Sequence, residues 1–407
     1  MDLGLERVEQ ACQLLGSPEK RQKTIHITGT NGKGSTVAFL VSILKSSGLQ
    51  VGSFTSPHLE NWNERISINN SPISNKDFFA ATFQILNRLE RKVQLTIFEF
   101  LTVAALFYFA EINPVDIVIY EVGLGGKHDA TNVVLPLVSI ITNIDYDHLR
   151  YLGSKLEGIA KEKAGIIKLN TPCFTAETRP RILTLLRKEG QKKRSKLVQV
   201  SGPKKFTFDK DELTMNFQFK IKKENFNIKT KMLGQHQIKN ICLAVEVAVF
   251  LKKKFPNITK DSIEKGITET FWPNRLEIVS RDPLLIIDGA HNHAGAKSLT
   301  KTITDLFLNK KPIFLVSVMK DKQVDKMLNT FRKIADQIIF TQMPSIRGKK
   351  INELNKSSDA KFRKIADCQK AFDFFYSLLN KKSIGIITGS LFFSSHVKKN
   401  FLSRFER

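Results

Sequence analysis

Residues 29–35 of this chain read Gly-Thr-Asn-Gly-Lys-Gly-Ser, and this stretch decides the fold. The apolar run Thr24–Thr28 before it is typical of a short buried strand, and the run Thr36–Leu44 after it is typical of a core helix. A strand, a glycine-rich turn, a lysine, a serine and a helix in this order are the layout of a phosphate-binding loop. Backbone N–H groups and the helix dipole would hold the anion there, and Lys33 would meet the β- and γ-phosphates.

The glycine spacing of this loop departs from the common phosphate-loop pattern G-x-x-x-x-G-K-[ST]. Only two residues separate Gly29 from Gly32, and Gly34 stands between Lys33 and Ser35. A second interpretation therefore stays open at this point, in which the stretch is a plain glycine turn that joins a strand to a helix.

Length and charge limit the classes of protein that fit. With 407 residues the chain is long for one core, so we expect two domains, and 42% hydrophobic with 25% charged residues is typical of a globular protein. The net charge of +25 invites a nucleic-acid partner, but the basic residues are scattered, and the one local cluster, at residues 187–196, reads as a polar loop. We therefore favour a solvated surface that attracts small polyanions over a nucleic-acid-binding role.

Cysteine usage and apolar runs indicate the compartment. The four cysteines, at positions 12, 173, 242 and 368, are far apart and form no C-x-x-C motif, which favours free thiols in a reducing cytoplasm over a disulfide or metal framework. No signal peptide opens the chain, and the longest apolar run, Phe100–Ala110, is shorter than the ~20 residues that a membrane span needs. We expect a cytoplasmic protein without membrane contact.

The order of apolar runs predicts an α/β protein in two domains. In the first part, runs of strand length alternate with helix-length patterns, which predicts a mostly parallel sheet with helices on both faces. The expected strands are Val51–Phe54, Asp116–Glu121, Val138–Ile144 and Pro172–Phe174, and the expected helices are Lys76–Lys92, Phe98–Ile112, Leu156–Ile166, Gln237–Lys253 and Lys260–Thr270. Between these, Phe206–Met232 alternates apolar and polar residues and predicts a small antiparallel β section.

Trp272-Pro273-Asn274 predicts the domain boundary, so we expect an N-terminal P-loop ATPase-like domain at residues 1–271 and a C-terminal Rossmann-like α/β domain at residues 272–407. The second part restarts the alternation of strands and helices. Its expected strands are Leu284–Asp288, Ile313–Val318, Gln337–Thr341 and Ile384–Thr388, and its expected helices are His293–Leu308, Asp321–Ala335, Cys368–Leu379 and Phe392–Phe405.

Three expected strands deliver polar groups at their carboxyl ends. Glu121 ends one apolar strand, and acidic residues at strand ends beside a phosphate loop commonly hold Mg²⁺, although a buried structural glutamate fits this segment too. His148 follows the next strand and Lys163 comes fifteen residues later; alone, each would be an ordinary loop histidine and a solvated lysine. In the second domain, Arg275 and His291 could supply charge for phosphoryl transfer.

The chain resembles the folylpolyglutamate synthase and dihydrofolate synthase family of the Mur ligase superfamily, and the resemblance runs through nearly the whole sequence. It is carried by motifs in a fixed order, namely the glycine loop at 29–35, Thr-Ser-Pro-His-Leu at 55–59, Asn-Glu-Arg-Ile at 63–66, Phe-Glu-Phe-Leu-Thr at 98–102, Gly-Leu-Gly-Gly at 123–126, Asp-Ala-Thr-Asn at 129–132, Asp-His at 147–148, Glu-Lys-Ala-Gly-Ile at 162–166, Gly-x-His-Gln-x-x-Asn at 234–240, Asn-Arg-Leu-Glu at 274–277, Asp-Gly-Ala-His-Asn at 288–292 and Thr-Gly-Ser-Leu at 388–391.

This resemblance implies a cytoplasmic, monomeric, ATP-dependent ligase that joins L-glutamate to a folate-type carboxylate. ATP would phosphorylate the acceptor carboxylate, the glutamate amine would attack the acyl phosphate, and phosphate would leave. The main expectation is a bifunctional enzyme that acts on dihydropteroate and on folates. The alternatives are a folylpolyglutamate synthase only and, from another class, a nucleic-acid-dependent P-loop ATPase.

The resemblance also implies roles for individual residues. The expected nucleotide-binding residues are Thr30, Asn31, Gly32, Lys33, Gly34, Ser35, Asn240, Arg275 and Asp288. The expected Mg²⁺ ligands, for two sites, are Ser56, Glu121, His148 and Lys163, with Lys163 carbamylated so that it offers an oxygen ligand. The expected substrate-binding residues are Ile97, Phe98, Glu99, Phe100, His128, Asp129, Ala130 and Ser390, and the expected catalytic residues are Lys33, Lys163, His148 and His291.

Three features depart from the family pattern. Lys127 stands where the family usually has arginine, which would turn a bidentate contact into a point contact. His293 replaces a common proline after His-Asn, and we expect a less rigid turn there. The chain starts at Met1 where relatives often carry further residues, so we expect either a missing part of the substrate loop or a misassigned start.

Overall fold

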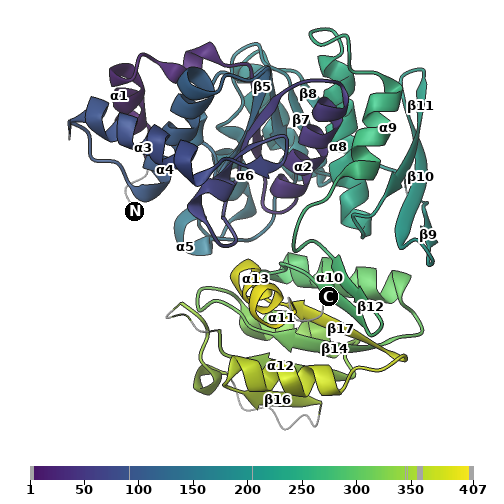
Figure 1. The fold of residues 1–407 in the computed structure, drawn as a ribbon. Helices are drawn as coiled ribbons and strands as arrows, with labels where there is room; N and C mark the ends of the chain where they lie inside the picture. The colour runs from purple at the N-terminus through teal and green to yellow at the C-terminus, as the bar shows by residue number, and fades with distance from the viewer. Residues whose placement is uncertain are drawn as a thin grey trace. The chain divides into compact units, whose positions relative to one another are not determined.

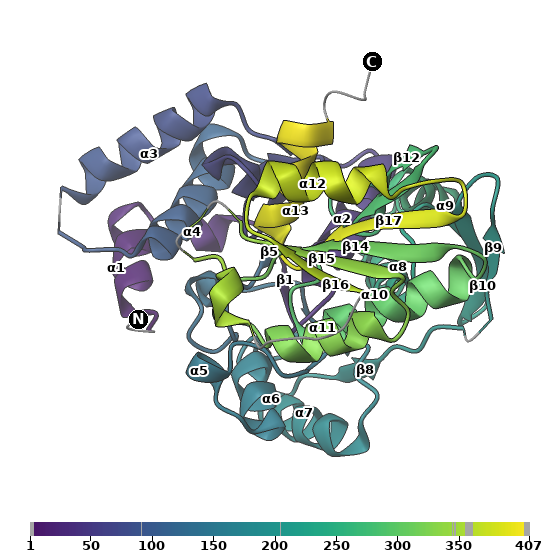
Figure 2. The same cartoon turned by 90° about the horizontal axis from the view of Figure 1, so that it is seen from below.

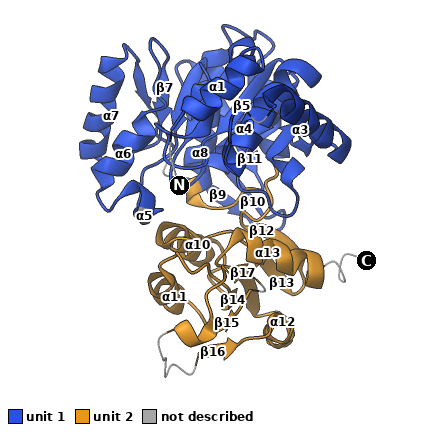
Figure 3. Ribbon diagram, turned by 90° about the vertical axis from the view of Figure 1, so that its left-hand side faces the viewer, with its two compact units in different colours: residues 1–231, 237–270 blue, residues 232–236, 271–407 orange. Residues whose placement is uncertain are grey.

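The structure of the chain, a computed structural model, describes residues 4–90, 92–203, 205–343, 345, 347–354 and 361–402. It divides into two compact units (Figure 3). The first unit comprises Met1–Lys231 and Gln237–Thr270, and the second comprises Met232–His236 and Phe271–Arg407. The strip Met232–His236 therefore belongs to the second unit although both of its flanks belong to the first.

The first unit is built on an eight-stranded sheet with the order β4-β3-β2-β5-β1-β6-β7-β8. Six neighbouring strands, from β2 to β8 in this order, are parallel, and β3 and β4 are antiparallel additions at one edge. The strands are β1 (Thr24–Thr28), β2 (Val51–Phe54), β3 (Ile66–Ile68), β4 (Ser71–Pro72), β5 (Ile117–Glu121), β6 (Val138–Ile141), β7 (Cys173–Thr175) and β8 (Leu197–Gln199). The central strands β1 and β5 are buried at every residue, as expected of a parallel sheet covered on both faces.

Helices cover this sheet (Figure 1). The helices of the unit are α1 (Glu6–Leu14), α2 (Lys33–Ser46), α3 (Asn75–Leu89), α4 (Ile97–Phe107), α5 (Leu149–Leu152), α6 (Leu156–Ala164), α7 (Pro180–Lys192), α8 (Gln235–Leu251) and α9 (Lys260–Glu269). Apolar residues of α1, α3 and α4 form one cluster with Val118 and Tyr120 of β5, and those of α6 and α7 form another with Ile141 and Cys173. Helix α2 is buried from Gly34 to Leu44, because it lies against the sheet on one side and α9 on the other.

A small antiparallel sheet completes the first unit. It has the order β11-β10-β9, with β9 at Thr207–Asp209, β10 at Thr214–Ile221 and β11 at Glu224–Thr230. The alternation of buried and less buried residues along β11 matches the alternation of the sequence, so the predicted antiparallel section is confirmed.

The second unit is a six-stranded sheet with the order β12-β13-β17-β14-β15-β16, in which only β12 is antiparallel (Figure 2). Its strands are β12 (Glu277–Arg281), β13 (Leu284–Ile287), β14 (Lys311–Val316), β15 (Gln337–Thr341), β16 (Phe362–Ile365) and β17 (Ser383–Thr388). Its helices are α10 (His293–Leu306), α11 (Val324–Arg332), α12 (Cys368–Ser377) and α13 (Leu391–Val397). Helices α12 and α13 pack on one face of the sheet, and α10 and α11 lie on the other (Figure 2). The predicted α/β class is thus confirmed in both units.

Some local predictions are wrong. The basic stretch 187–196 is not a loop over most of its length, because residues up to Lys192 belong to α7. This helix buries Ile182, Leu183 and Leu186, which recur at helical spacing. Its lysines and arginines therefore lie on the opposite face. The expected helix Phe392–Phe405 changes its hydrogen-bonding pattern: the α-helix α13 ends at Val397, a π-helical turn at Lys398–Leu402 continues it, and residues 403–405 lie outside the described residues.

Candidate functional site

Three strand ends of the first unit meet at one edge of its sheet. In the parallel register, Ile27 of β1 pairs with Glu121 of β5, and Thr28 pairs with Ile141 of β6. The turns that follow these strands therefore start side by side. This edge is where open α/β sheets place their ligand sites.

The glycine loop after β1 is held by the turn after β6. The backbone N–H of Thr30 donates to the Asn143 carbonyl at 2.9 Å, and the N–H of Asn31 donates to the Asn143 side chain at 2.8 Å. The Thr30 hydroxyl donates to the Asp145 carbonyl at 3.0 Å and accepts from the Asp145 N–H at 2.8 Å. These bonds fix the loop's shape before any ligand arrives.

Two glycines of the loop are required by close neighbours. A Cβ atom on Gly29 would lie 1.8 Å from the Thr142 hydroxyl oxygen, and a Cβ on Gly32 would lie 2.5 Å from the Asn240 side-chain oxygen. Gly32 also has φ +85°, a left-handed value that favours glycine. The unusual spacing of these glycines thus fits this particular loop.

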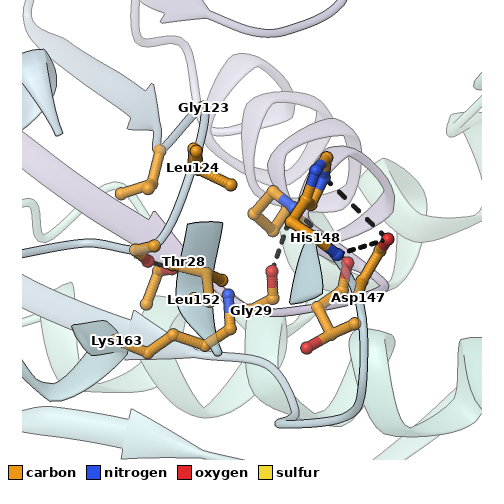
Figure 4. Close-up of a pocket in the computed structure, with 12 residues that line it drawn as sticks. Thr28, Gly29, Gly123, Leu124, Asp147, His148, Leu152 and Lys163 are labelled. Carbon is orange, nitrogen blue, oxygen red and sulfur yellow. Dashed lines mark hydrogen bonds and ion pairs between the residues drawn. The ribbon is translucent and has the colours of Figure 1, made fainter. Parts of the chain in front are cut away.

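Lys33 is the first residue of α2, and its ammonium group bends back over the loop. It donates to the Gly29 carbonyl at 3.0 Å and to the Thr30 carbonyl at 3.5 Å. A pocket opens beside it, here called the phosphate-loop pocket (Figure 4). Its lining residues are Thr28, Gly29, Thr30, Lys33, Val122, Gly123, Leu124, Gly125, Asp147, His148, Leu152 and Lys163.

Lys163, near the end of α6, is the most unusual group of this pocket. It is only 4% exposed, and its side chain extends in among the pocket residues (Figure 4). Burial and the nearby charge of Lys33 lower the pKa of Lys163 to about 7, against the opposing effect of Asp147 and Asp129. No hydrogen bond or ion pair holds its ammonium group within the part of the chain that the structure describes. A substantial fraction of this amine is therefore neutral at neutral pH.

His148 lies at the mouth of the pocket and follows Asp147 in the turn after β6. The Asp147 carboxylate accepts the backbone N–H of His148 at 2.8 Å and lies 3.9 Å from its Nε2 atom. His148 adopts a left-handed φ of 51° at the position directly before α5. The structure thus brings Thr30, Lys33, His148 and Lys163 together, as expected of one site.

Glu121 and Ser56 lie at neighbouring strand ends and not in the pocket lining. The carboxylate of Glu121 accepts the backbone N–H of Ser56 at 3.3 Å, and Glu121 is 4% exposed. Among the described residues, no group of three or more His, Cys, Asp and Glu side chains could hold a metal ion. A carboxylate with a hydroxyl still suits Mg²⁺, because this ion usually binds one or two carboxylates together with substrate phosphates and water.

Helix α8 supports the loop from a third side. The side-chain amide of Gln237 donates to the Ser35 hydroxyl at 3.3 Å. The side-chain amide of Asn240 donates to the side-chain oxygen Oε1 of Gln237 at 2.9 Å. Asn240, which we expected to bind nucleotide, thus lies against Gly32 in the first unit.

The turn Val122–Gly125 forms one wall of the pocket, and Phe98 of α4 packs against it. A Cβ on Gly123 would lie 2.4 Å from the Phe98 ring, so this glycine permits the close approach of that ring. The carboxylate of Glu99 is already engaged within this structure: it accepts hydrogen bonds from the guanidinium group of Arg7, and it caps α4 by accepting the Thr96 N–H at 2.7 Å. Ile97 is 67% exposed, and Phe100 is half-buried.

The remaining expected substrate residues follow this wall in sequence. His128 is partly exposed, whereas Asp129 and Ala130 are buried at the start of a short helical turn, Ala130–Val133. The Asp129 carboxylate caps this turn, accepting the Thr131 N–H at 3.1 Å. Asp129 therefore has a structural task whatever it contacts in addition.

The second unit has its own cluster at the carboxyl end of β13. The Asp288 carboxylate accepts the N–H of Leu276 at 3.0 Å and the N–H of Ala290 at 2.9 Å. Burial raises the pKa of Asp288, and the positive charge of Arg275 opposes that rise. His291 lies in the same turn, with its Nδ1 atom 2.9 Å from the Gly289 carbonyl. Ser390 is buried at the start of α13, at the end of the neighbouring strand β17.

Several pocket residues escaped the sequence analysis. Asn143 and Asp145 shape the loop, and Thr28, Val122 and Leu152 line the pocket. The signal for Asn143 and Asp145 was present, since both follow an apolar strand that was predicted to end in polar groups. Leu152 carried no such signal, because an apolar residue in a short helix looks like any core residue.

Comparisons with known proteins give the family. The Mur ligase middle domain matches residues 27–248, and the Mur ligase glutamate ligase domain matches residues 274–391. A protein of Bacillus subtilis named dihydrofolate synthase/folylpolyglutamate synthase is 38% identical over 97% of this chain and 94% of its own length. The folylpolyglutamate synthase of Lacticaseibacillus casei is 30% identical over 97% of this chain and 94% of its own length.

A solved structure gives the same result. The folylpolyglutamate synthase of Mycobacterium tuberculosis, complexed with ADP and AMPPCP, superimposes with a TM-score of 0.90 at 28% identity, over 99% of this chain and 96% of the other. The resemblance inferred from the sequence motifs is therefore confirmed.

Proposed function

Because this chain belongs to the Mur ligase family, we propose that it is a bifunctional dihydrofolate synthase and folylpolyglutamate synthase. It is an ATP-dependent ligase that joins L-glutamate to dihydropteroate and to folates that already carry glutamate. The observation that carries this proposal is the phosphate-loop pocket, in which a glycine loop, Lys33 and a buried Lys163 converge. Its support is the match with relatives of this name over nearly the whole chain.

The reaction is the one that the family resemblance implies, and the pocket's residues suit it. An oxygen of the acceptor carboxylate attacks the γ-phosphorus of ATP, the bond to the β-phosphate oxygen breaks, and ADP leaves. The glutamate amine then attacks the acyl carbon, loses a proton, and phosphate departs with the bonding electrons. Lys33 and the backbone N–H groups of the loop stabilise charge on the transferred phosphoryl group. The buried walls exclude water, which would otherwise hydrolyse the acyl phosphate.

We expect Mg²⁺ to be held by Ser56 and Glu121 at one site and by His148 and Lys163 at a second site. A bound Mg²⁺ would neutralise charge on the phosphate oxygens. The fit rests on the donor set, namely a buried carboxylate beside a serine, and a histidine beside a lysine whose amine loses its proton readily.

Lys163 fits this role only after modification, because an ammonium group repels a cation. The neutral amine can attack CO₂ and lose a proton, which gives a carbamate with two oxygen ligands. A pKa of about 7 keeps enough neutral amine for this step. We therefore propose that Lys163 is carbamylated in the active enzyme.

Labelled bicarbonate tests this modification directly. With ¹³C-bicarbonate, wild-type protein is expected to show a carbamate ¹³C resonance that Lys163→Ala lacks. Lys163→Ala is expected to keep its fold, lose most ligase activity, and recover part of it with short carboxylic acids. Full activity of wild type in CO₂-depleted buffer would contradict the modification and leave the ligase function intact.

For the second unit we propose that Arg275 and Asp288 contact the nucleotide and that His291 assists phosphoryl transfer. Residues 1–271 would act as the ATP-binding central domain and residues 272–407 as the glutamate ligase domain. We also propose that the acceptor is bound by the residues predicted for it, which are Ile97, Phe98, Glu99, Phe100, His128, Asp129, Ala130 and Ser390. The carboxylate of Glu99 is engaged by Arg7, so Glu99 would shape the acceptor site without offering a free carboxylate to the substrate.

The runner-up is an enzyme that accepts only folates with glutamate already attached. The Lacticaseibacillus casei relative, named folylpolyglutamate synthase alone, supports this alternative. A nucleic-acid-dependent ATPase is favoured only by the net charge of +25.

ADP release separates these functions. With ATP and Mg²⁺, the proposed enzyme should release ADP only when glutamate and an acceptor are both present, and both dihydropteroate and tetrahydrofolate should serve. Activity with tetrahydrofolate alone would favour the runner-up. ADP release that responds to a polynucleotide and ignores glutamate would refute ligase function.

We propose further that the enzyme is a cytoplasmic monomer that binds no nucleic acid and no membrane. The four cysteines are free thiols, which suits a reducing compartment. In the part of the chain that the structure describes, none of the helices combines the length and apolar character needed to cross a bilayer. Light scattering on purified protein checks the oligomeric state.

A further inference from the structure

A buried histidine precedes the phosphate loop and has no part in the chemistry derived above. His26 lies in the middle of β1 and is fully buried. Its Nε2 atom lies 2.9 Å from the Thr131 hydroxyl oxygen, and its Nδ1 atom has no hydrogen-bond partner among the described residues. This unpaired nitrogen needs an explanation, because buried polar groups in proteins are almost always hydrogen-bonded.

The hydrogen bonds around Thr131 have one consistent direction. Its hydroxyl lies 2.5 Å from Oδ1 of Asp129, a carboxylate that can only accept when ionised, so the hydroxyl donates to it. The hydroxyl has one proton and must therefore accept from His26, which fixes the histidine proton on Nε2. Burial and the charge of Lys168 lower the pKa of His26 to about 3, which agrees with a neutral ring.

The chain of bonds ends at the pocket. The second oxygen of Asp129 accepts the backbone N–H of Leu124 at 2.8 Å, and Leu124 lines the phosphate-loop pocket beside Gly123 and Gly125. Burial raises the pKa of Asp129, and its hydrogen bonds from Thr131 and Leu124 oppose this rise. Each donor therefore helps to keep the carboxylate ionised and in place.

A second bond from the same strand reaches the same wall. The Thr28 hydroxyl donates to the Gly125 carbonyl at 2.7 Å. Strand β1 thus holds both ends of the turn Leu124–Gly125, directly through Thr28 and indirectly through His26, Thr131 and Asp129. The phosphate loop itself depends on other bonds, from Asn143 and Asp145.

We propose that His26 is a positioning residue for the acceptor substrate, which acts through Thr131 and Asp129 on the pocket wall at Leu124. This inference rests on the proposed ligase function, since the wall and the phosphate loop line the same pocket, where the acceptor carboxylate must meet the γ-phosphate. The Leu124 end of the wall is held by the buried Asp129 carboxylate, so a small shift of Asp129 misplaces the acceptor's carboxylate end. His26 touches no reacting atom.

Paired substitutions test this assignment in the full-length protein. His26→Phe keeps the ring but removes the donor, whereas His26→Gln offers an amide N–H near the Nε2 position. Thr131→Val and Thr131→Ser form a second pair, which decides the matter if His26→Phe does not fold. Ser47→Ala is the matched control, because it also removes a buried hydrogen-bonded hydroxyl, at the far end of α2.

The readout compares two ligands. We expect His26→Phe and Thr131→Val to weaken dihydropteroate binding about tenfold, which corresponds to one buried hydrogen bond, while AMPPCP binding stays within about twofold of wild type. His26→Gln, Thr131→Ser and Ser47→Ala should bind both ligands like wild type. Calorimetric titrations with dihydropteroate and AMPPCP measure these constants.

Three results would overturn the proposal. The first is wild-type dihydropteroate binding by both His26→Phe and Thr131→Val, and the second is equal weakening of both ligands, which indicates a purely structural role. The third is a failure of His26→Gln and Thr131→Ser to restore binding. In each case wild type would still release ADP in a glutamate-dependent way, so the ligase function would survive; a wild type inactive with dihydropteroate and tetrahydrofolate would overturn both.

Discussion

The two units each place a buried charged side chain beyond the carboxyl end of a strand, β1 in the first unit and β13 in the second. The two side chains differ in how their charge is compensated. Beyond β1, Lys163 is buried in the pocket without a hydrogen bond or ion pair among the described residues, and its pKa falls to about 7. Beyond β13, Asp288 is also buried, but two backbone N–H groups and the charge of Arg275 compensate it. The first arrangement favours the neutral amine, and the second organises a turn. A buried charged group without a hydrogen bond thus indicates chemistry more strongly than burial alone.

Removing the loop cation should produce the largest effect. Lys33→Ala takes away a positive charge at the site of phosphoryl transfer, which should cost about 3–4 kcal/mol, or a drop in kcat of order 10²–10³. Lys45→Ala, at the exposed far end of α2, is the control and should leave kcat unchanged. ADP release at saturating ATP is the measurement. Near-normal turnover of Lys33→Ala would show that the first turn is not a phosphate site.

The second turn should respond in stability. Asp288→Ala leaves the N–H groups of Leu276 and Ala290 buried without an acceptor, so we expect a loss of about 2–4 kcal/mol in the free energy of unfolding. Asp288→Asn keeps one acceptor oxygen and should lose less. The measurement is denaturant unfolding, followed by the fluorescence of the second unit or by its amide hydrogen exchange. An Asp288→Ala protein as stable as wild type would mean that the carboxylate does not organise this turn.

The pH dependence of stability tests the burial of Lys163, because loss of its charge should stabilise the protein. Its pKa is about 7 when folded and ~10.4 when unfolded, so between these values the unfolded chain binds more protons. The free energy of unfolding should therefore rise with pH in this window, by at most about 1.4 kcal/mol per pH unit, and the full penalty should remain below pH 7.

Lys163→Met lacks this titration and is the reference for the measurement. In CO₂-free buffer, the stability difference between Lys163→Met and wild type should shrink as the pH rises from 7 to 9. A difference that stays constant over this range would place Lys163 in solvent and remove the contrast with Asp288.

The smallest effects on stability are expected for ion pairs that lie outside both turns. Arg7→Ala leaves Glu99 buried without its cation and should lose about 1 kcal/mol, whereas Lys192→Ala breaks an exposed pair with Glu189 and should change stability by less than about 0.5 kcal/mol. Thermal unfolding of both variants is the measurement. Equal losses would indicate that burial of Glu99 matters less than the structure suggests.

Sequence patterns predicted the parallel strands well because parallel strands are continuous apolar runs. β2 and β15 have the predicted bounds, and β5 and β17 differ by one residue. The edge strands β8, β12 and β16 were missed, since they are short and only partly buried and carry no clear period.

Residue type and local order were enough to predict Lys33 in the phosphate loop, whereas His148 and Lys163 were expected in the site only because their motifs resemble those of the family. The sequence could not give the bonds that depend on distant segments meeting. Arg7 lies 92 residues from Glu99, and His26 lies 105 residues from Thr131. Such pairs follow from the strand order, which a single sequence leaves open.

The strip Met232–His236 has a consequence for how this protein can be rearranged in evolution. Its five residues pack with the second unit: His236 bonds Ser298 on α10, and Gly234 approaches Thr302 closely. Gln237, the next residue, belongs to the first unit and supports Ser35. A recombination event at the junction near Phe271 would therefore transfer the rest of the second unit without the strip Met232–His236 that packs with it. Hybrids between diverged relatives should inherit a mismatch at α10, so the two units are expected to descend together.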